Sequence, residues 1–328
     1  MRVSSVSKRK SEEERAMTEL RSVSISGELL LDMHSLNNEA AEGNQQITRM
    51  VHIVNQDGEL AVVNAVSGDM LKHIQAEHLH ALAKTRGLPL CAGCRVFDAN
   101  RVNKDTEFID ALPTDDYTEG LDRLIQHCAV DDAEGILVTA GKRSMARKST
   151  VEFGWLVGLP DRTRTESYFH VKYDPRSRGE GSGDETGANV GQNIFYRPAS
   201  SGVYAAVCTI EVSRIGWNDL SREYAIPDAD RKARVKSVLE SVALTFIEPA
   251  GAQRNTQNPH ILGFRGVVSV STGPVPAPTV SPLSTDFRAQ VEAIAEQLNR
   301  SWPGSVTVHG FDSLSEFSRV MTDLAEAV

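Results

Sequence analysis

The chain has 328 residues, of which 40% are hydrophobic and 24% charged, and its formal net charge is −9. A chain of this size can bury one large core or two modest ones, so we expect a soluble globular protein. No apolar run approaches the roughly 18 residues that a membrane helix needs, and the N-terminal stretch lacks the apolar block of a signal peptide. We therefore expect a cytoplasmic protein with no membrane partner, whose four cysteines are reduced.

The negative charge argues at first against nucleic-acid binding, because sequence-independent affinity comes mainly from Lys and Arg. The charges are unevenly distributed, however. Residues 142–178 hold nine basic and four acidic side chains, whereas residues 98–134 hold eleven acidic and three basic ones. A molecule with one basic face can bind RNA and still be acidic overall.

The first predicted element follows a polar tail. Residues 1–20 are rich in Ser, Lys, Arg and Glu, which predicts disorder. Apolar and polar residues alternate over 23–33, which predicts a strand with one buried face. The Asn- and Gly-rich residues 34–49 predict a loop. Their amide and guanidinium groups can bond phosphates, 2′-hydroxyls or base edges, although Asn and Gly also dominate ordinary turns. The candidates are Asn37, Asn38, Asn44 and Arg49.

A helix is predicted from Gly68 to about residue 84, because Leu71, Ile74, Leu79 and Leu82 recur at helical spacing. Ser67 is well placed to cap this helix. Unpaired N–H groups at its start, together with Lys72, could hold a phosphate. An ordinary capped helix with a solvated lysine is the alternative.

Residues 86–134 are rich in Gly, Pro, Asn and acids, which indicates an inserted subdomain. Cys91 and Cys94 form half of a zinc motif that Cys128, with His127, could complete. A single CxxC is weak evidence, so we expect idle thiols and no cofactor or metal, with that zinc site as the alternative.

The second half of the chain alternates strands with one clear helix. Strands are predicted over 135–139, 153–158, 168–173, 194–196 and 203–212, a helix over 228–246 and a strand over 266–271. The glycine-rich, charged residues between 173 and 194 indicate a long hairpin arm, about residues 172–196. Residues 273–328 follow as a proline linker and a C-terminal helical extension. These units predict an α+β fold with a ferredoxin-like, or RNA-recognition-motif-like, core over 21–272.

Several motifs in this order resemble the Cas-seven family of CRISPR-associated proteins, in its DevR autoregulator branch. The resemblance covers residues 23–272 and is carried by ISGELLLDMHSLNNEAAEGNQQITR, AVSGDMLKHIQ, HCAVDDAEGILV, RSMARKSTVEFGWLVGLPD and NIFYRPASSGVYAAVCTIEVSRIG. It implies a modified RNA-recognition-motif palm, a finger insert over about 86–134 and a β-hairpin thumb.

The resemblance also implies a function. Such a protein is a non-enzymatic backbone subunit of a type I Cascade complex for antiviral defence, which polymerises head to tail along the CRISPR RNA (crRNA) and presents it to target DNA. Its other partners would be Cascade subunits of the Cas-five, Cas-eight and Cas-six kinds and an optional small subunit. The matching RNA-binding positions, besides the loop residues above, are Ser67, Lys72, His73, Arg143, Arg147, Lys148, Arg176, Arg178 and Arg254.

One rival hypothesis is catalytic. Type III relatives of the same family carry a catalytic aspartate near the end of the first strand, where this chain has Asp32 and His34. The alternative function is therefore a metal-dependent ribonuclease that uses Asp32 to cut target RNA. A DNA-binding regulator has no support, because no helix-turn-helix signature with a basic recognition helix is present.

Overall fold

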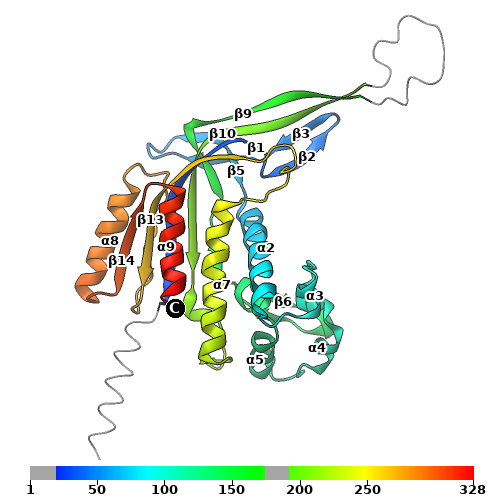
Figure 1. Cartoon of the computed structure of the whole chain (residues 1–328), viewed down its shortest axis with the longest axis vertical. Helices are drawn as coiled ribbons and strands as arrows, with labels where there is room; N and C mark the ends of the chain where they lie inside the picture. The colour runs from blue at the N-terminus through cyan, green and yellow to red at the C-terminus, as the bar shows by residue number, and fades with distance from the viewer. Residues whose placement is uncertain (1–19, 174–191) are drawn as a thin grey trace, which may run out of the picture.

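The computed structural model describes residues 20–173 and 192–328, and a large, mostly antiparallel sheet forms its centre (Figure 1). The strands follow the order β14-β13-β1-β10-β9-β5-β4. Strand β8 pairs with the end of β10, and the β2–β3 hairpin joins β10 through β3. The strands of this sheet are β1 (Ser22–His34), β2 (Asn38–Glu42), β3 (Gln45–Thr48), β4 (Met50–Val54), β5 (Leu60–Val66), β8 (Val151–Phe153), β9 (Leu156–Tyr173), β10 (Gln192–Ile210), β13 (His260–Ser271) and β14 (Val306–Phe311).

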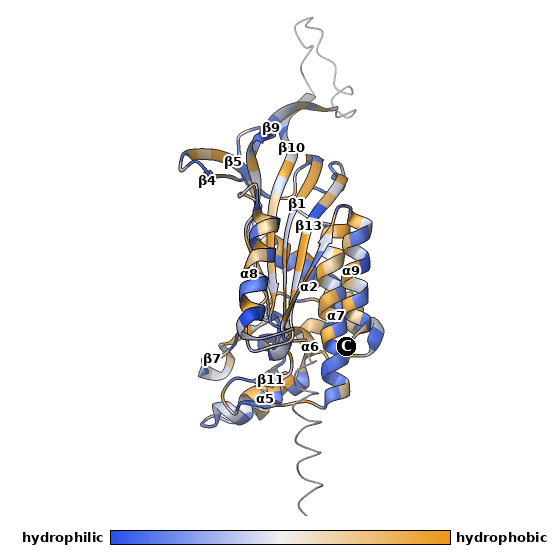
Figure 2. Ribbon diagram, turned by 90° about the vertical axis from the view of Figure 1, so that its left-hand side faces the viewer, coloured by the Kyte–Doolittle hydropathy of each residue, from blue (hydrophilic) through white to orange (hydrophobic). Residues whose placement is uncertain are grey.

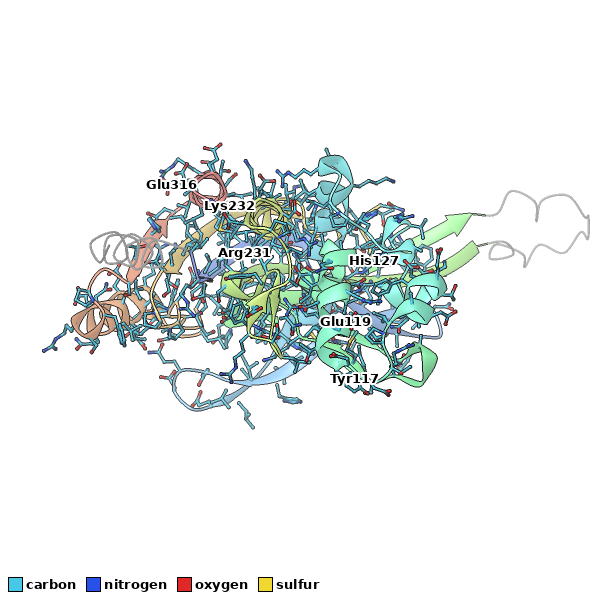
Figure 3. All side chains as sticks on the ribbon, turned by 90° about the horizontal axis from the view of Figure 1, so that it is seen from below. Tyr117, Glu119, His127, Arg231, Lys232 and Glu316 are labelled. Carbon is cyan, nitrogen blue, oxygen red and sulfur yellow. The ribbon has the colours of Figure 1, made fainter. Side chains whose placement is uncertain are left out.

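Helices cover both faces of the sheet (Figure 2). Helices α2 (Gly68–Arg86), α7 (Asp228–Ile247) and α9 (Leu314–Glu326) lie on one face, and α8 (Phe287–Ser301) lies on the other. The view from below shows His127 of the insert on one side of α7, which carries Lys232, and Glu316 of α9 on the other side (Figure 3). The predicted mixture of helices and strands is confirmed, and the elements predicted over 68–84 and 228–246 correspond to α2 and α7.

The insert after α2 is mainly helical. It contains α3 (Ala92–Arg95), η1 (Arg101–Lys104), α4 (Thr106–Ala111), α5 (Tyr117–His127) and α6 (Ala129–Glu134). Two small sheets adjoin it, formed by β6 (Ile136–Val138) with β7 (Met145–Arg147) and by β11 (Trp217–Asn218) with β12 (Glu223–Tyr224). Among the described residues there are also two short helices, η2 (Ala140–Lys142) and η4 (Val212–Arg214).

A cluster of phenylalanines forms the centre of the core between the sheet and α7 and α9. Phe264 of β13 stacks on Phe246 of α7 with ring centroids 4.8 Å apart, and Phe311 and Phe317 contact the same ring edge-on or tilted. Gly27 of β1 makes room for it, because a Cβ atom there would lie 2.6 Å from the Phe264 ring. Aromatic packing therefore fixes how β1, β13, α7 and α9 meet.

Strand β1 is buried on both faces, so the prediction of one buried face is wrong. Ser24 and Ser26 point away from the phenylalanines, and a proline-rich segment covers them. Ser24 donates to the carbonyl of Ala277 (3.1 Å), and the Ser26 and Thr279 hydroxyls are 2.8 Å apart. The predicted proline linker is thus packed on the sheet, where serine hydroxyls donate to its buried backbone carbonyls.

The polar stretch predicted as a loop is mostly the β2–β3 hairpin, so that prediction is wrong too. Residue pairs from Asn38 with Thr48 to Glu42 with Gln45 close it around Gly43, whose φ is +56°. Its composition resembles a loop because β2 is almost fully exposed and needs no apolar face. The predicted disordered tail, except Leu20, lies outside the described residues, and the predicted domain boundaries stay predictions. None of the described helices is long and apolar enough to cross a membrane.

Candidate nucleic-acid interface

The β9–β10 hairpin is paired as far as the described residues extend (Figure 1). Its two faces differ in chemistry. Residues directly opposite each other in an antiparallel pair share a face. One face therefore carries aromatic and basic groups, namely Tyr168 opposite Arg197 and His170 opposite Phe195. The other carries apolar and aromatic groups, namely Phe169 opposite Tyr196 and Val171 opposite Ile194. Rings on the outer part of this hairpin are exposed, including those of Tyr168, Phe169 and Tyr196.

The basic face is preorganised by ring contacts. The His170 ring stacks on the Phe195 ring at a centroid distance of 5.5 Å, and the Arg197 guanidinium lies 4.8 Å from the centroid of the same ring. Arg197 also donates to the hydroxyl of Thr256 at 3.0 Å. These contacts hold a flat cation and two rings in fixed positions.

A groove of about 350 Å³ separates this hairpin from β2–β3, and we call it the arm groove. The two walls are joined where the Tyr196 N–H donates to the carbonyl of Asn44 at 2.8 Å. The lining residues are Ala41, Gly43, Asn44, Gln45, Gln46, Ile194, Phe195, Tyr196 and Arg197. Amides, aromatic rings and a guanidinium in one groove suit the hydroxyls, base faces and phosphates of a single nucleic-acid strand.

Asn37 and Ser67 act inside the protein, where they tie the end of β1 to the start of α2. The Asn37 side-chain oxygen accepts the Ser67 N–H at 2.8 Å, and Ser67 caps α2 by accepting the Met70 N–H at 3.2 Å. The predicted cap is confirmed. Both side chains are buried, so in this structure they position the neighbouring surface and do not form it. Asn38 accepts the Ser35 hydroxyl at 2.8 Å and retains a buried amide nitrogen with no hydrogen bond.

Arg49 lies beside this network and is partly exposed. Its guanidinium is 5.0 Å from the centroid of the Trp155 ring and pairs with Glu39 at 2.5 Å. A second arginine, Arg254, pairs with Glu248 in a loop whose Ala252 N–H donates to the carbonyl of Leu36. That loop also holds Thr256, the partner of Arg197. The fold therefore brings the predicted residues around 37–49 and 251–254 to one end of the sheet, beside the arm groove.

Lys72 and His73 point elsewhere, toward the insert. Lys72 forms an ion pair with Glu134, whose side chain is fully buried, and the His73 ring lies 5.6 Å from that of Phe97. Both line a pocket of about 420 Å³ that also contains Asp69 and Glu134. An RNA phosphate would have to compete with these carboxylates for Lys72.

Arg147 is fully buried, and all five of its N–H donors have protein acceptors. They reach the Asp132 carboxylate at 2.8 Å and its carbonyl at 3.1 Å, the carbonyls of Trp217 and Arg214, and Asp219 at 3.3 Å. These bonds leave no group of Arg147 for an RNA phosphate in this structure.

The two basic residues near Arg147 in the sequence, Arg143 and Lys148, differ in their contacts and exposure. Arg143 donates to the carbonyl of Leu112 at 2.8 Å within the insert, whereas Lys148 is 74% exposed and lies 4.0 Å from Glu152. Arg176 and Arg178 lie outside the described residues, so their predicted contacts stay predictions.

Asp32 is partly exposed near the end of β1, opposite His260 of β13. Within residues 20–173 and 192–328, the one group of three or more metal-ligating side chains does not include Asp32. His34 is buried, and desolvation lowers its pKa to about 4, so its ring is neutral at neutral pH. The metal-dependent ribonuclease that uses Asp32 therefore stays a hypothesis.

The one cluster found brings together Cys91, Cys94, Cys128 and Asp131, all buried. Burial raises the pKa of Asp131 to about 8 and also raises that of Cys128. His127 is not a member, contrary to the zinc alternative from the sequence, because its ring stacks on Phe108 and contacts Asp105 at 2.9 Å. Sequence reasoning missed Asp131, although Cys128 and Asp131 repeat the spacing of Cys91 and Cys94.

Sequence reasoning also missed Tyr196 and Arg197. The signal was present in the run Phe195-Tyr196-Arg197, where two aromatic side chains directly precede an arginine. Loop asparagines and the local count of basic residues do not reveal it. Both are poor guides to which groups the fold leaves accessible.

Comparisons with known proteins show the family and the fold of this chain. The family model described as "CRISPR-associated negative auto-regulator DevR/Csa2" matches residues 25–292. No curated protein matches the chain. A chain of a solved "CRISPR RNA-guided surveillance complex, pre-nicking" superposes with a TM-score of 0.53 at 11% identity, over 93% of this chain and 99% of that one. A chain of another "CRISPR RNA-guided surveillance complex" has a TM-score of 0.48 at 12% identity, with the same coverage. The first likeness shows a shared fold, and the family match, which spans most of the sequence, confirms the resemblance: this chain belongs to the DevR/Csa2 family of CRISPR-associated proteins.

Proposed function

We propose that this protein is a non-enzymatic backbone subunit of a type I CRISPR surveillance complex and that the arm groove holds the guide RNA. The observation that carries the proposal is the groove itself, in which Asn44 faces Tyr196 and Arg197. Family membership and the shared fold with a surveillance-complex chain support the same assignment.

The chemistry of the groove suits an RNA of any sequence. Rings such as those of Phe195 and Tyr196 can stack on any base, and a guanidinium can meet any phosphate. Amide groups of Asn44 and Gln45 can bond 2′-hydroxyls, which distinguish RNA from DNA. Recognition of the target DNA is then left to base pairing with the guide.

The described architecture can be assigned to the parts of a hand. The central sheet with α2, α7 and α9 would be the RNA-recognition-motif-like palm, the helical insert α3–α6 the finger, and the β9–β10 hairpin the thumb. The apolar face of the thumb, with exposed Phe169 and Val171, would meet the next copy of the chain, because exposed apolar patches mark interaction sites. Head-to-tail contacts that do not close produce a filament, which other Cascade subunits would cap in the cytoplasm.

The first test is co-expression of the chain with a matching CRISPR array and its neighbouring genes, followed by sequencing of the RNA in the purified assembly. We expect discrete repeat-flanked guides in a large particle. A nucleic-acid-free monomer would overturn the backbone assignment.

The second test locates the RNA. Tyr196→Ala with Arg197→Ala removes one ring and one cation from the groove, whereas Arg319→Ala removes an exposed arginine of α9 that does not line the groove. The groove variant should lose guide RNA, and the α9 variant should retain it. Equal retention by both variants would place the RNA elsewhere.

A further inference from the structure

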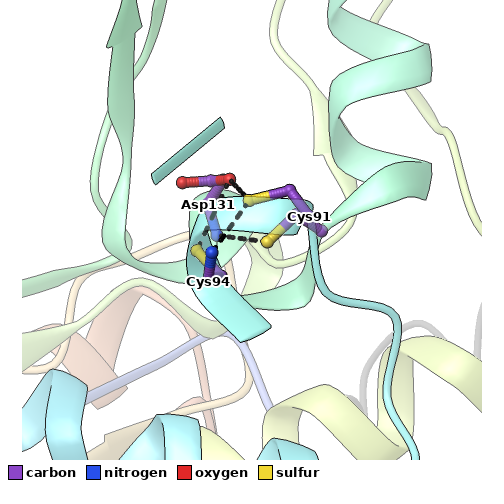
Figure 4. A group of neighbouring side chains, drawn as sticks. Cys91, Cys94 and Asp131 are labelled. Atoms are coloured by element: carbon purple, nitrogen blue, oxygen red, sulfur yellow. Dashed lines mark hydrogen bonds between the residues drawn. The ribbon is translucent and has the colours of Figure 1, made fainter. Parts of the chain in front are cut away.

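Three thiols and one carboxylate meet inside the finger, at the opposite end of the molecule from the β9–β10 hairpin (Figure 1). Figure 4 shows Cys91, Cys94 and Asp131 of this group. Cys91 and Cys94 come from the start of α3, and Cys128 and Asp131 come from the start of α6. One ligand atom from each lies within 4.8 Å of every other, and at most 2% of any of these side chains is exposed. The set is closed to solvent, as structural metal sites are.

The two halves of the cluster have the same local geometry. Cys91 accepts the Cys94 N–H at 3.3 Å, and Cys128 accepts the Asp131 N–H at 3.4 Å. Each pair is thus a turn in which the first sulfur bonds the backbone of the second ligand. Such N–H···S bonds stabilise a sulfur that carries negative charge, as a metal-bound thiolate does. Two matching turns supply four ligands.

The spacing fits a tetrahedral ion. A zinc ion with sulfur at about 2.3 Å and oxygen at about 2.1 Å would place those two ligand atoms roughly 3.6 Å apart. The observed distances from the Asp131 Oδ2 are 3.2 Å to the Cys91 sulfur and 3.8 Å to the Cys94 sulfur. The four side chains therefore need little movement to coordinate one ion.

The surroundings also suit a bound cation with anionic ligands. Asp131 Oδ1 is buried and makes no hydrogen bond, and its nearest cation is the Arg101 guanidinium at 3.6 Å. Arg101 is held by the carbonyl of Gly135 at 2.7 Å. The backbone of Arg101 presses on the first turn, where a Cβ on Gly93 would lie 2.0 Å from its carbonyl oxygen. A metal ion would compensate a carboxylate that the protein otherwise buries at a cost.

We propose that Cys91, Cys94, Cys128 and Asp131 bind one structural zinc ion that fastens the two ends of the finger together. Thiolate-rich tetrahedral sets select zinc over harder ions. Cys91 lies near the entry to the finger and Asp131 near its exit, and the Ala129 N–H already donates to the carbonyl of Pro89 at 2.8 Å between them. The site is independent of the proposed RNA-binding function.

Elemental analysis of the full-length protein, purified under reducing conditions from zinc-supplemented cells, tests this site. We expect about one zinc per chain in the unmodified protein and less than about a tenth in Cys94→Ser with Cys128→Ser, because closed structural sites lose their metal without their thiolates. The matched control is Cys208→Ser, which changes a buried cysteine of β10 outside the cluster and should keep the full zinc content.

A second measurement does not depend on the folding of the variants. The unmodified protein, stripped with a chelator and reduced, is titrated with cobalt(II), whose thiolate complexes absorb strongly. We expect the absorption to saturate at one equivalent and to disappear when zinc is added. A chain that holds neither zinc nor cobalt, that holds iron instead, or that is purified with a Cys91–Cys94 disulfide would overturn the proposal. Zinc content that persists in the groove variant, Tyr196→Ala with Arg197→Ala, would confirm that the two sites are independent.

Discussion

Two arginines illustrate how differently two regions of this molecule use positive charge. Arg147, between α6 and residues 214–219, is buried, and every one of its donors is bonded inside the protein. Arg197, in the arm groove, lies against the Phe195 ring, donates to Thr256 and is partly exposed. A basic residue is available to RNA only where the fold leaves its donors unpaired, so a count of charges along the sequence does not locate a nucleic-acid site.

The largest expected effect comes from Arg147→Ala. Arg147 and Arg234 both bond Asp132, at 2.8 and 2.9 Å, and all three side chains are buried. Removal of one member of a buried ion pair costs about 3–5 kcal/mol. Denaturant unfolding should show a loss of this size, whereas Lys148→Ala, which changes an exposed neighbour, should stay within about 0.5 kcal/mol of the unmodified protein. If Arg147→Ala kept its stability but lost RNA, Arg147 would belong to the interface.

A pH titration extends the comparison to His34, a buried basic side chain that is neutral in the folded protein at neutral pH. Desolvation lowers the pKa of His34 from 6.5 to about 4 in the folded chain. Between these values the unfolded chain takes up a proton and the folded chain does not, so stability is complete above pH 6.5 and is lost as the pH falls. At about 1.4 kcal/mol per pH unit, the loss is about 3 kcal/mol by pH 4.

The measurement is the free energy of unfolding at several pH values. His34→Gln, which does not titrate, should show a pH dependence flatter than that of the unmodified protein over this window. Parallel curves for the two proteins would mean that the pKa of His34 is the same in the folded and the unfolded chain.

Groove substitutions should produce smaller changes in affinity. Phe195→Ala removes the ring that supports both His170 and Arg197. Loss of one stacking ring costs about 1–3 kcal/mol per base, which is roughly 5- to 150-fold in affinity for single-stranded RNA. Fluorescence anisotropy at fixed salt measures it, with Trp302→Ala, an exposed aromatic next to α8, as the control. Equal losses in both variants would make the Phe195 effect nonspecific.

The sequence predicted the regular parts of the fold better than the candidate site. The period of apolar residues located α2 and α7, and the Ser67 cap was predictable because its chemistry is local. The β2–β3 hairpin was not, because β2 is exposed and shows no apolar alternation, and the pairing of β3 with Tyr196 links positions about 150 residues apart. The burial of Arg147 depends likewise on Asp132, Trp217 and Arg214, which only the folded chain brings together.

The smallest expected effect distinguishes a scaffold from a nuclease. Asp32→Ala changes a partly exposed carboxylate at the end of β1 that belongs to no cluster of metal-ligating groups among the described residues. Stability should change by less than about 0.5 kcal/mol, and guide RNA should be retained and remain intact. The assay incubates the assembly with complementary RNA and a divalent ion and follows strand length on a gel. Cutting by the unmodified protein that Asp32→Ala abolishes would replace the scaffold with the metal-dependent ribonuclease, because only a catalytic carboxylate would make an otherwise unimportant side chain essential.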